Sequence, residues 1–569
     1  MKSVYFDKQI RVSGYTGKLS TNVIDNFLLD IYESNPAILD IFHERDIKPY
    51  RDLLPWSGEF AGKYLLSSYY LYKFTGHEEL YNYIQDFIKK LISLIDEDGY
   101  LGCFQKECRM TGAYSQSPEM YGSTWDAWSH YYIMYGLYLW NKEIASREIK
   151  ASLDKIVSFF TNNFYKTSRK ITDMGSCEMN MAPIHIFMIL YCDTKEEKYL
   201  SFAKKMIQDM KDGLLGDYIE CLENEIDFNE LPNNRWEFMP VLRGLYEIKN
   251  NGEKTDYKKI IEKLFYNLLM KNTKSTGGFF YNDDIIELCS VVAFLDLACD
   301  IFLENHDLNI ADFLELAHYN AVLGSFSSSG RWSTYNTPIT GQKISSCGSL
   351  AYQSRPGSPE LNSCSVGSGW GLGMPVRWMI TESEDTLYVN YYENFTGETK
   401  EELIITTEGD YLQNGTVTLS VNNNNKRFIA LRIPAWTCKA DITVKFGEDL
   451  RSYVAEGGKY FIIGADCHNL QIEIDFHNKL RIEKAKGEFT KKHCVYFGPV
   501  LYGVDQALNE YISIDKLPVI KGMDFSKCKP VQDINGRLIM QIGGIKLCDF
   551  AHIGSSGSLY TALLNFKKE

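Results

Sequence analysis

The sequence predicts a mainly α fold with additional β structure: an (α/α)6 barrel domain followed by C-terminal β-sandwich domains. Three observations lead to this fold class. The chain has 569 residues, which is too long for one hydrophobic core, so roughly two to four domains are expected. Pairs of amphipathic helices recur about every 55 residues in the first two thirds. After residue 385 the hydrophobic period drops to two, as in β-strands.

The helix pairs account for the first part of the chain. In residues 57–95 apolar residues recur at three- and four-residue spacing on both sides of the turn TGHEE. Gly76 is expected to end the first helix, because glycine readily adopts the left-handed conformation found after helices. Similar pairs are predicted at 123–162, 184–210, 238–270 and from 290 onward, with turns near 194, 251 and 306. A closed ring explains the repeats better than an open solenoid, because the series ends without a polar capping repeat.

Short β-rich segments follow the helical part. They are 386–392, 416–421, 427–436, 441–447, 460–465 and 470–476. Turn clusters such as NNNN at 422–425 separate them, which is typical of a β-sandwich. Weaker strands at 493–505 and 537–550 indicate a second, smaller sandwich. We therefore assign 1–383 to the barrel, 384–479 to the first sandwich and 480–569 to the second.

Charge and composition restrict the class of partner. The formal net charge is −14, which argues against nucleic acid and against an anionic membrane surface. The N-terminal MKSVYFDKQI lacks the apolar core of a signal peptide, and no segment approaches the roughly 20 apolar residues of a membrane span. The 14 cysteines are scattered, without a CxxC pair, as expected for reduced thiols. We expect a cytoplasmic protein; a homodimer is one expectation for its assembly.

Aromatic residues are abundant at 14% of the chain, with 38 tyrosines. Tyrosine and tryptophan combine a flat apolar face with one polar group, which suits the recognition of sugar rings. A large helical core uses the same residues for packing, so both explanations remain open.

Polar stretches at the expected starts of inner helices are candidates for carbohydrate contacts. They lie at 56–64 (WSGEFAGKY), 124–132 (TWDAWSHYY) and 233–239 (NNRWEFM). Carboxylates at helix starts are also stabilised by the helix dipole alone, and a lone histidine is usually structural. The candidate substrate-binding residues are Glu59, Trp125, Asp126, His130 and Glu237.

A carboxylate and two cysteines form a candidate metal site. Glu287 and Cys289 lie two residues apart at the start of a predicted helix, in DDIIELCSVV. Cys364, in ELNSCSVGSGW, follows after one more helix pair and supplies a third ligand. Carboxylate and thiolate ligands suit Zn²⁺, and three protein ligands leave a fourth position for water, a hydroxyl or substrate. Taken alone, the pair Glu-x-Cys is a weak signal, and the cysteine stretch could equally be a turn or a packing site.

Several motifs together resemble glycoside hydrolase family 127, the β-L-arabinofuranosidase-like family. They are ELCSVV (287–292), YNAVLGSFSSSGRWSTYNTP (319–338) and RPGSPELNSCSVGSGWGLGM (355–374), supported by DEDGYLGCF (96–104), LYVNYY (387–392), LRIPAW (431–436) and FGPVLYG (497–503). The resemblance covers nearly the whole chain. It implies an (α/α)6 barrel with β-sandwich domains, in agreement with the periods above.

The resemblance also implies a mechanism. In this family a zinc ion is held by a Glu-x-Cys pair and two adjacent cysteines, the first of which attacks the anomeric carbon with retention. A glutamate shortly before the Glu-x-Cys pair is the acid/base. Carried over to this sequence, Glu287, Cys289 and Cys364 match zinc ligands, and His130 matches a sugar-contacting histidine.

Two departures from the family pattern bear on catalysis. In the gapless register the adjacent cysteines fall on Ser363 and Cys364, so a serine stands at the nucleophile position. A serine hydroxyl is much less nucleophilic than a thiolate. A shift by one residue makes Cys364 the nucleophile but breaks the register at the following GLG. In addition, the segment 268–284 contains no glutamate, which leaves Asp283 and Asp284 as candidate acids.

Three functional hypotheses follow. The first is a glycosidase that cleaves a terminal sugar from a small oligosaccharide at a zinc–cysteine site. The second is a non-catalytic sugar-binding protein that retains the cleft, which the two departures favour. The third is a different zinc-dependent carbohydrate-active enzyme, such as a lyase or a hydrolase in which the metal activates water. All three imply a carbohydrate partner.

Overall fold

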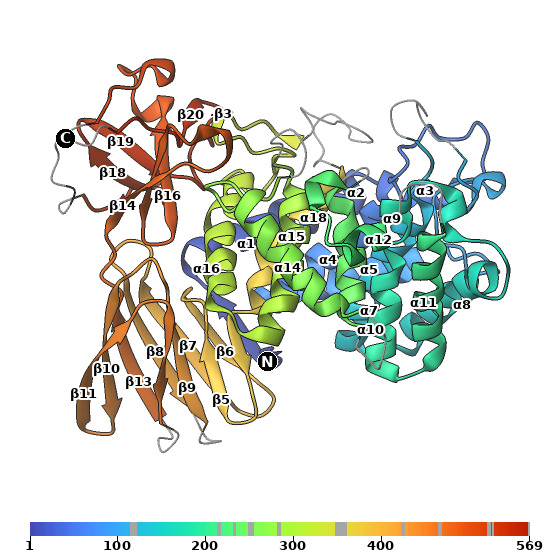
Figure 1. Ribbon diagram of the computed structural model, residues 1–569, viewed down its shortest axis with the longest axis horizontal. Coiled ribbons are helices and arrows are strands. Elements are labelled where there is room, and N and C mark those ends of the chain that lie inside the picture. Colours follow the sequence, from blue (N-terminus) through green and yellow to red (C-terminus); the bar gives the residue numbers. More distant parts are fainter. Residues whose placement is uncertain are drawn as a thin grey trace.

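The structure is a computed structural model that describes residues 1–113, 122–212, 218–231, 235–248, 255–280, 286–346, 361–422, 427–464, 469–520, 525 and 528–566. Helices prevail up to Arg377, and strands from Ile380 onward. The chain therefore has the mixed helical and β architecture that the sequence predicts. Figure 1 shows the strands gathered at one end of the helical part.

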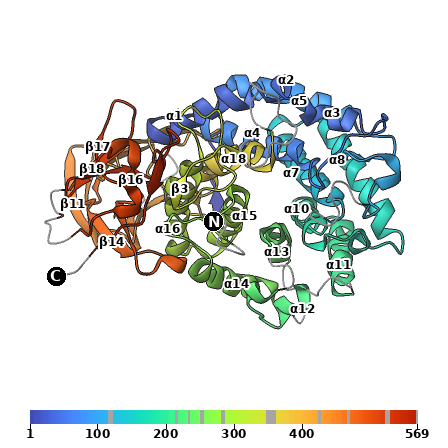
Figure 2. The same cartoon turned by 90° about the horizontal axis from the view of Figure 1, so that it is seen from above.

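Six helices of the described chain form a closed cycle of contacts. Each packs against the next, α4 against α7, then α10, α13, α15 and α18, and α18 packs back against α4. Figure 2 shows these helices around the inside of a ring. Their bounds are α4 (Glu59–Thr75), α7 (Asp126–Ile144), α10 (Pro183–Thr194), α13 (Met239–Tyr246), α15 (Leu288–Asn305) and α18 (Ser363–Gly373).

A second set of helices lies outside the ring (Figure 2). In order, α5, α8, α11, α14 and α16 pack against α4, α7, α10, α13 and α15, while α1 packs against α18. They are α1 (Gly14–Val23), α5 (Glu78–Ile92), α8 (Arg147–Phe160), α11 (Glu197–Lys211), α14 (Tyr257–Lys271) and α16 (Leu308–Ala317). Shorter helices are α2 (Ile31–Ser34), α3 (Ala37–His43), α9 (Cys177–Asn180) and α12 (Tyr218–Glu223).

The inner and outer helices differ in how much of their surface is buried. Nearly every residue of α4 is buried, including polar ones such as Ser67 and Ser68. In α5 only one face is buried, through residues such as Ile84 and Phe87. A helix enclosed on all sides is apolar or small all round, whereas an outer helix shows polar and apolar faces.

The turns within the helix pairs share one conformation. Gly76 ends α4 with φ +68°, as predicted, and Ala145, Lys195 and His306 end α7, α10 and α15 with left-handed backbones. A capping side chain starts the next helix in the case of α5, α8 and α16; for example, Ser146 Oγ accepts a hydrogen bond from the backbone N–H of Ile149 at 3.3 Å. The turn predicted near residue 251 lies outside the described residues.

The strands form three sheets among the described residues. One has the order β1-β4-β5-β9-β12, a second β11-β10-β13-β8-β7-β6-β2, and the third β14-β15-β16-β19-β18-β17 with β20 and β3 attached. The first sheet comprises β1 (Lys2–Ser3), β4 (Ile380–Glu382), β5 (Thr386–Val389), β9 (Phe428–Ile433) and β12 (Lys459–Ile463). The second comprises β2 (Gln9–Val12), β6 (Phe395–Glu398), β7 (Ile404–Asp410), β8 (Thr416–Asn422), β10 (Lys439–Phe446), β11 (Asp449–Glu456) and β13 (Asn469–Asp475).

The second sheet has one buried face. Alternate residues of β13, Leu470, Ile472 and Ile474, are buried, and their neighbours are exposed. The register pairs Ile472 with Val444 on one side and with Leu419 on the other, which aligns apolar side chains across the sheet. This is the period-two pattern that the sequence predicts.

Four short strands come from the segment assigned to the helical domain. β1 and β2 pair with β4 and β6, and β4 itself lies just before residue 384. β3 (Thr340–Gln342) pairs with β20 (Leu559–Thr561) in the third sheet. That sheet also holds β14 (Leu480–Lys484), β15 (His493–Phe497), β16 (Val500–Asp505), β17 (Val531–Gln532), β18 (Leu538–Ile542) and β19 (Ile545–Asp549). The domain boundaries stay predictions, but the sheets take strands from both sides of them.

Buried charged contacts join α16 to the strands. Arg432 of β9 is buried and its Nη2 lies 2.5 Å from Glu315 of α16. The hydroxyl of Tyr411 and the indole of Trp436 also donate hydrogen bonds to Glu315, at 2.6 and 3.0 Å. In the described part of the chain, no helix combines the length and the apolar character that crossing a membrane requires.

Candidate metal and active site

The candidate residues lie at the N-terminal ends of the inner helices. Glu59, Asp126 and Ser363 are the first residues of α4, α7 and α18, and Glu287 immediately precedes α15. Direct contacts bring the starts of three of these helices together: Lys63 Nζ of α4 lies 2.7 Å from Ser363 Oγ of α18 and 3.6 Å from Cys289 Sγ of α15. Unpaired backbone N–H groups at helix starts favour negatively charged groups such as thiolates and carboxylates.

Glu287 and Cys289 are held by the start of α15. Glu287 is still extended, and it pairs with Asn336 in an isolated β-bridge. The backbone N–H of Leu288 donates to the carbonyl of Tyr335 at 3.0 Å. Trp236 Nε1 donates to Glu287 Oε2 at 3.2 Å, which fixes the carboxylate within the protein.

Cys364 is held by the first turn of α18. Asn362 caps this helix: its side chain accepts a hydrogen bond from the backbone N–H of Ser365, and Ser365 Oγ accepts one from the backbone N–H of Asn362. This reciprocal capping box fixes the start of the helix. The sequence ELNSCSVGSGW therefore forms a helix start, and Cys364 lies inside the ring.

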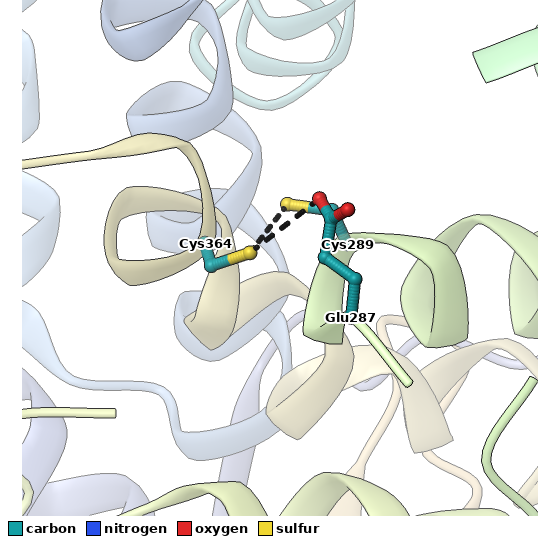
Figure 3. A group of neighbouring side chains, drawn as sticks. All are labelled: Glu287, Cys289 and Cys364. Carbon is teal, nitrogen blue, oxygen red and sulfur yellow. Dashed lines mark hydrogen bonds between the residues drawn. The ribbon is translucent and has the colours of Figure 1, made fainter. Parts of the chain in front are cut away.

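The three predicted metal ligands converge. Cys289 Sγ lies 3.3 Å from Cys364 Sγ, and Cys364 Sγ lies 3.8 Å from Glu287 Oε1. All three side chains are buried, and their ligand atoms lie within 4.8 Å of one another. Figure 3 shows them pointing toward one another from α15 and α18.

The donor set fits a metal ion. Two sulfurs bound tetrahedrally at about 2.3 Å lie about 3.8 Å apart, so the cysteine pair needs only a small opening to accept an ion. A bound cation also compensates a buried carboxylate for its lost hydration. Glu287, Cys289 and Cys364 can therefore hold a metal ion.

A lysine lies next to these metal donors. Lys63 lies on the first turn of α4 and is buried. Its Nζ donates to Ser363 Oγ at 2.7 Å, lies 3.1 Å from Glu59 Oε1, and lies 3.6 Å from Cys289 Sγ. Ser363 Oγ is itself 3.3 Å from Cys289 Sγ. Ser363 therefore lies between a lysine and a cysteine.

The buried groups shift one another's pKa values. Burial would raise the pKa of the Cys289 thiol, but the hydrogen bond with Cys364 and the charge of Lys63 outweigh it, so this pKa is lowered. Burial and the neighbouring Cys289 raise the pKa of Cys364 well above its usual value. Burial and the charge on Cys289 likewise raise the pKa of Glu287. In the absence of metal, one proton on Cys364 and one on Glu287 are therefore favoured.

Lys63 is a cation in this environment. Burial lowers the pKa of its ammonium, but negative charge on Cys289 and Glu59 outweighs that effect, and the pKa is raised above its usual value.

Glu59 and Glu237 lie near the donors, but each has a partner. The indole N–H of Trp128 donates to Glu59, which also pairs with Lys63. Glu237 is buried and forms an ion pair with Arg235 at 3.0 Å. Its charge contributes to the raised pKa of Glu287. Their predicted contacts with a sugar stay predictions.

His130 and Asp126 hold a neighbouring segment. Nδ1 of His130 contacts the backbone oxygen of Asp126 at 2.8 Å, and its Nε2 accepts from the backbone N–H of Leu101 at 3.0 Å. Asp126 accepts from the Tyr100 hydroxyl and from the backbone N–H of Met110 at 2.9 Å. Both ring nitrogens of the buried His130 are thus engaged within the protein. A sugar contact of His130 stays a prediction that this geometry does not favour.

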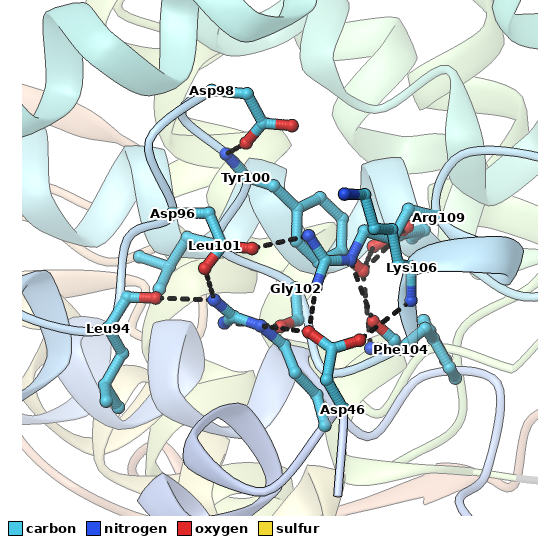
Figure 4. Close-up of polar contacts among 12 residues, drawn as sticks. Asp46, Leu94, Asp96, Asp98, Tyr100, Leu101, Gly102, Phe104, Lys106 and Arg109 are labelled. Atoms are coloured by element: carbon cyan, nitrogen blue, oxygen red, sulfur yellow. Dashed lines mark hydrogen bonds and ion pairs between the residues drawn. The ribbon is translucent and has the colours of Figure 1, made fainter.

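The segment held in this way, residues 96–110, is fixed on its other side by ion pairs (Figure 4). Arg109 Nη1 lies 2.5 Å from Asp96, and Arg109 also pairs with Asp46. The backbone N–H of Lys106 donates to Asp46 at 2.9 Å. These contacts tie the segment to α7 on one side and to Asp46 on the other.

Trp125 lies beside two side chains from the other polar stretches at the helix starts, Trp56 and Arg235. Its ring centre is 4.9 Å from that of Trp56, and the guanidinium carbon of Arg235 lies 5.5 Å from the Trp125 ring centre. Its contact with a sugar stays a prediction. Asp283 and Asp284, the candidate acids, lie outside the described residues.

Sequence analysis did not select Lys63 or Trp236, although both lie within stretches that it singled out. The signal for Lys63 was its position four residues after Glu59, which places both side chains on the same face of α4.

Comparison with known proteins identifies the family. A family model described as β-L-arabinofuranosidase, GH127 catalytic domain, matches residues 1–365. The match covers more than half of the chain, and the chain therefore belongs to glycoside hydrolase family 127. The resemblance found in the sequence is therefore confirmed. No curated protein matches the chain.

Solved structures show the same fold. A GH127 β-L-arabinofuranosidase from Geobacillus stearothermophilus T6 superposes with a TM-score of 0.73 at 14% identity, covering 98% of this chain and 100% of that one. The GH127 β-arabinofuranosidase BT3674 gives a TM-score of 0.72 at 14% identity, covering 100% and 98% of the two chains. At these identities the similarity concerns the fold.

Proposed function

We propose that this protein is a zinc-dependent, β-L-arabinofuranosidase-like hydrolase that removes a terminal sugar from a small oligosaccharide. The observation that carries the proposal is the convergence of Glu287, Cys289 and Cys364 inside the helical ring of a family 127 chain. Two thiolates and one carboxylate suit Zn²⁺ better than Mg²⁺ or Ca²⁺, which prefer oxygen ligands alone.

The ring of helices and the sheets are consistent with the fold that the sequence predicts. We infer that the closed cycle of helices is the (α/α)6 barrel and that the sheets form the predicted β-sandwiches. The cyclic contacts and the buried face of the second sheet support this. A homodimer remains an expectation.

Cys364 is our candidate nucleophile. A bound zinc ion would keep thiols deprotonated at neutral pH. Cys364 Sγ attacks the anomeric carbon, a C–S bond forms, and the C–O bond to the leaving group breaks. Asp283 or Asp284 donates a proton to the departing oxygen. Water then attacks the same carbon and gives its proton to that carboxylate, and the thiolate is restored with net retention.

Ser363 is a weaker candidate for the same step. Its Oγ accepts a hydrogen bond from the Lys63 ammonium, and a charged lysine cannot take the proton that a serine nucleophile must lose. Lys63 therefore favours Cys364 as the nucleophile, even though Ser363 stands at the corresponding position of the family motif.

The test is a comparison of two alanine variants on a nitrophenyl β-L-arabinofuranoside. We expect Ser363→Ala to retain most of the activity and Cys364→Ala to lose both turnover and zinc. Mass spectrometry of acid-quenched wild-type protein should find the sugar on Cys364. An active Cys364→Ala variant would contradict the proposal.

A sugar-binding protein without catalysis is the second candidate, because Ser363 replaces the family's nucleophilic cysteine. It predicts that the wild-type protein binds arabinose-containing oligosaccharides in calorimetry but does not hydrolyse even the nitrophenyl substrate.

A further inference from the structure

Lys63 is a cationic side chain that contacts the metal donor Cys289. Its Nζ lies 3.6 Å from Cys289 Sγ and 2.7 Å from Ser363 Oγ, the residue that takes the place of a cysteine in the family motif. Ser363 and Cys289 are themselves 3.3 Å apart. At the corner of the centre where the family motif has a third cysteine, this chain thus has a neutral hydroxyl that is hydrogen-bonded to an ammonium.

The lysine is enclosed and cannot swing away freely. Nζ lies 4.8, 5.3 and 5.8 Å from the ring centres of Tyr132, Trp236 and Trp128. The faces of aromatic rings attract cations and exclude water. Glu59, at 3.1 Å, is its carboxylate partner. The ammonium is therefore fixed beside the donors by contacts on several sides.

A fixed positive charge has opposite effects on the metal-free and metal-bound centre. Without metal, it contacts Cys289, donates a hydrogen bond to Ser363 and pairs with Glu59, and so holds these side chains together. With a divalent cation in the same pocket, like charges a few ångströms apart in a poorly hydrated site repel each other. The same lysine therefore stabilises the empty centre and disfavours the occupied one.

We propose that Lys63 is a resident cation of this centre, which preforms it without metal and sets its affinity for zinc below that of the same donors without the lysine. This inference rests on the proposed zinc site. Lys63 acts as a positioning residue, and Glu59 moderates its charge. Removal of Lys63 and removal of Glu59 should therefore change zinc affinity in opposite directions.

The test is the zinc dissociation constant, measured on the full-length, chelator-treated protein by competition with a chromogenic chelator. Lys63→Gln removes the charge and keeps a hydrogen-bond donor, and we expect it to bind zinc about tenfold more tightly or better. Glu59→Gln leaves the lysine charge uncompensated, and we expect zinc binding to weaken by a similar factor.

Lys73→Gln is the matched control. Lys73 lies on the same helix, is also buried, and pairs with Asp7 and Glu143 at 3.0 Å each. Its removal costs a buried ion pair but leaves the metal donors untouched, so the zinc affinity should not change. A second readout is the melting temperature: Lys63→Gln should lower it without zinc and increase the rise caused by zinc.

The outcomes separate this inference from the proposed function. If the wild-type protein binds zinc and Lys63→Gln binds it equally or more weakly, the role of Lys63 is wrong and the zinc site stands. If the wild-type protein and all variants fail to bind zinc, the zinc site is wrong and this inference falls with it. If Lys63→Gln does not fold, Glu59→Gln decides: an unchanged or tighter affinity contradicts the inference.

Discussion

At the residue scale, the first turn of α18 distinguishes this chain from the family pattern. In the gapless register with the family motif, Ser363 stands where the resemblance implies a cysteine, and Lys63 adds a positive charge 2.7 Å away. A hydroxyl in place of a thiolate and an ammonium nearby both make the centre less negative. Metal affinity and nucleophile strength should therefore respond strongly to single substitutions here.

Ser363→Cys should supply a third thiolate beside Cys289 and Cys364. We expect zinc affinity to rise by about tenfold or more, because a thiolate is a far better zinc ligand than a hydroxyl, and hydrolysis of a nitrophenyl substrate to become faster. Chelator competition and a rate assay measure the two effects. Ser368→Cys, one turn further along α18, is the control and should change neither. Unchanged zinc affinity in Ser363→Cys would show that position 363 does not belong to the centre.

Zinc uptake should depend on pH. Burial and the neighbouring Cys289 raise the pKa values of Cys364 and Glu287, which favours their protonated forms in the metal-free protein. Zinc binding must displace these protons, so affinity should increase as the pH rises from 6 to 8, by up to about a hundredfold per unit for two protons. Calorimetry in buffers of different ionisation enthalpy counts the protons released. Affinity that is independent of pH would contradict the assigned proton positions.

At the element scale, the ring depends on close contact between inner helices. A Cβ atom on Gly62 of α4 would lie 2.4 Å from the backbone carbon of Tyr132 in α7. A Cβ on Gly373 of α18 would lie 2.4 Å from the backbone carbon of Tyr70 in α4. No side chain fits at these crossings, so glycine lets the backbones approach and brings Lys63 up to the cysteines.

Gly62→Ala should therefore destabilise the protein by about 2 kcal/mol or more, because the two helices must move apart. Gly367→Ala on α18 is the matched control, since its nearest neighbour would be Lys63 Cδ at an ordinary 3.6 Å. Denaturant unfolding of both variants gives the comparison. Equal stability of the two variants would refute the close-packing argument.

At the scale of the whole molecule, a buried carboxyl group lies where helices meet sheets. Glu393 follows β5 and accepts a hydrogen bond from Thr16 of α1 at 2.6 Å, and Tyr319 lies within 3.5 Å. Burial raises the pKa of Glu393 to about 7. The folded protein thus retains a proton there that the unfolded chain releases nearer its ordinary pKa, so this group's contribution to stability falls as the pH rises toward 7.

Glu393→Gln should remove that dependence. Glutamine keeps an acceptor for Thr16 and carries no charge, so the variant should gain about 2 to 3 kcal/mol over the wild type between pH 5 and pH 8. The measurement is the difference in free energy of unfolding at the two pH values. A constant difference would show that Glu393 is ionised without penalty in the folded protein.

Some elements of the fold could be predicted from the sequence, and others could not. The helix pairs and the turn at Gly76 could be predicted, because hydrophobic period and glycine conformation are local properties. The pairing of β1 and β2 with strands hundreds of residues later could not, since such short strands carry little local signal.

For the candidate site, Glu287, Cys289 and Cys364 could be predicted because the family motif fixes their order. Lys63 escaped selection because a lysine four residues after a glutamate usually marks an ordinary surface ion pair. His130 was selected for its neighbours, but the pattern could not reveal that both ring nitrogens bond within the protein.

The most direct test of the central claim is the rate of nitrophenyl β-L-arabinofuranoside hydrolysis while zinc is returned to the chelator-treated protein. If Glu287, Cys289 and Cys364 hold the metal on which catalysis depends, the rate should rise from near zero and level off at one zinc per chain. The Cys364→Ala variant should stay inactive throughout. A wild-type rate that is the same with and without zinc would contradict the account.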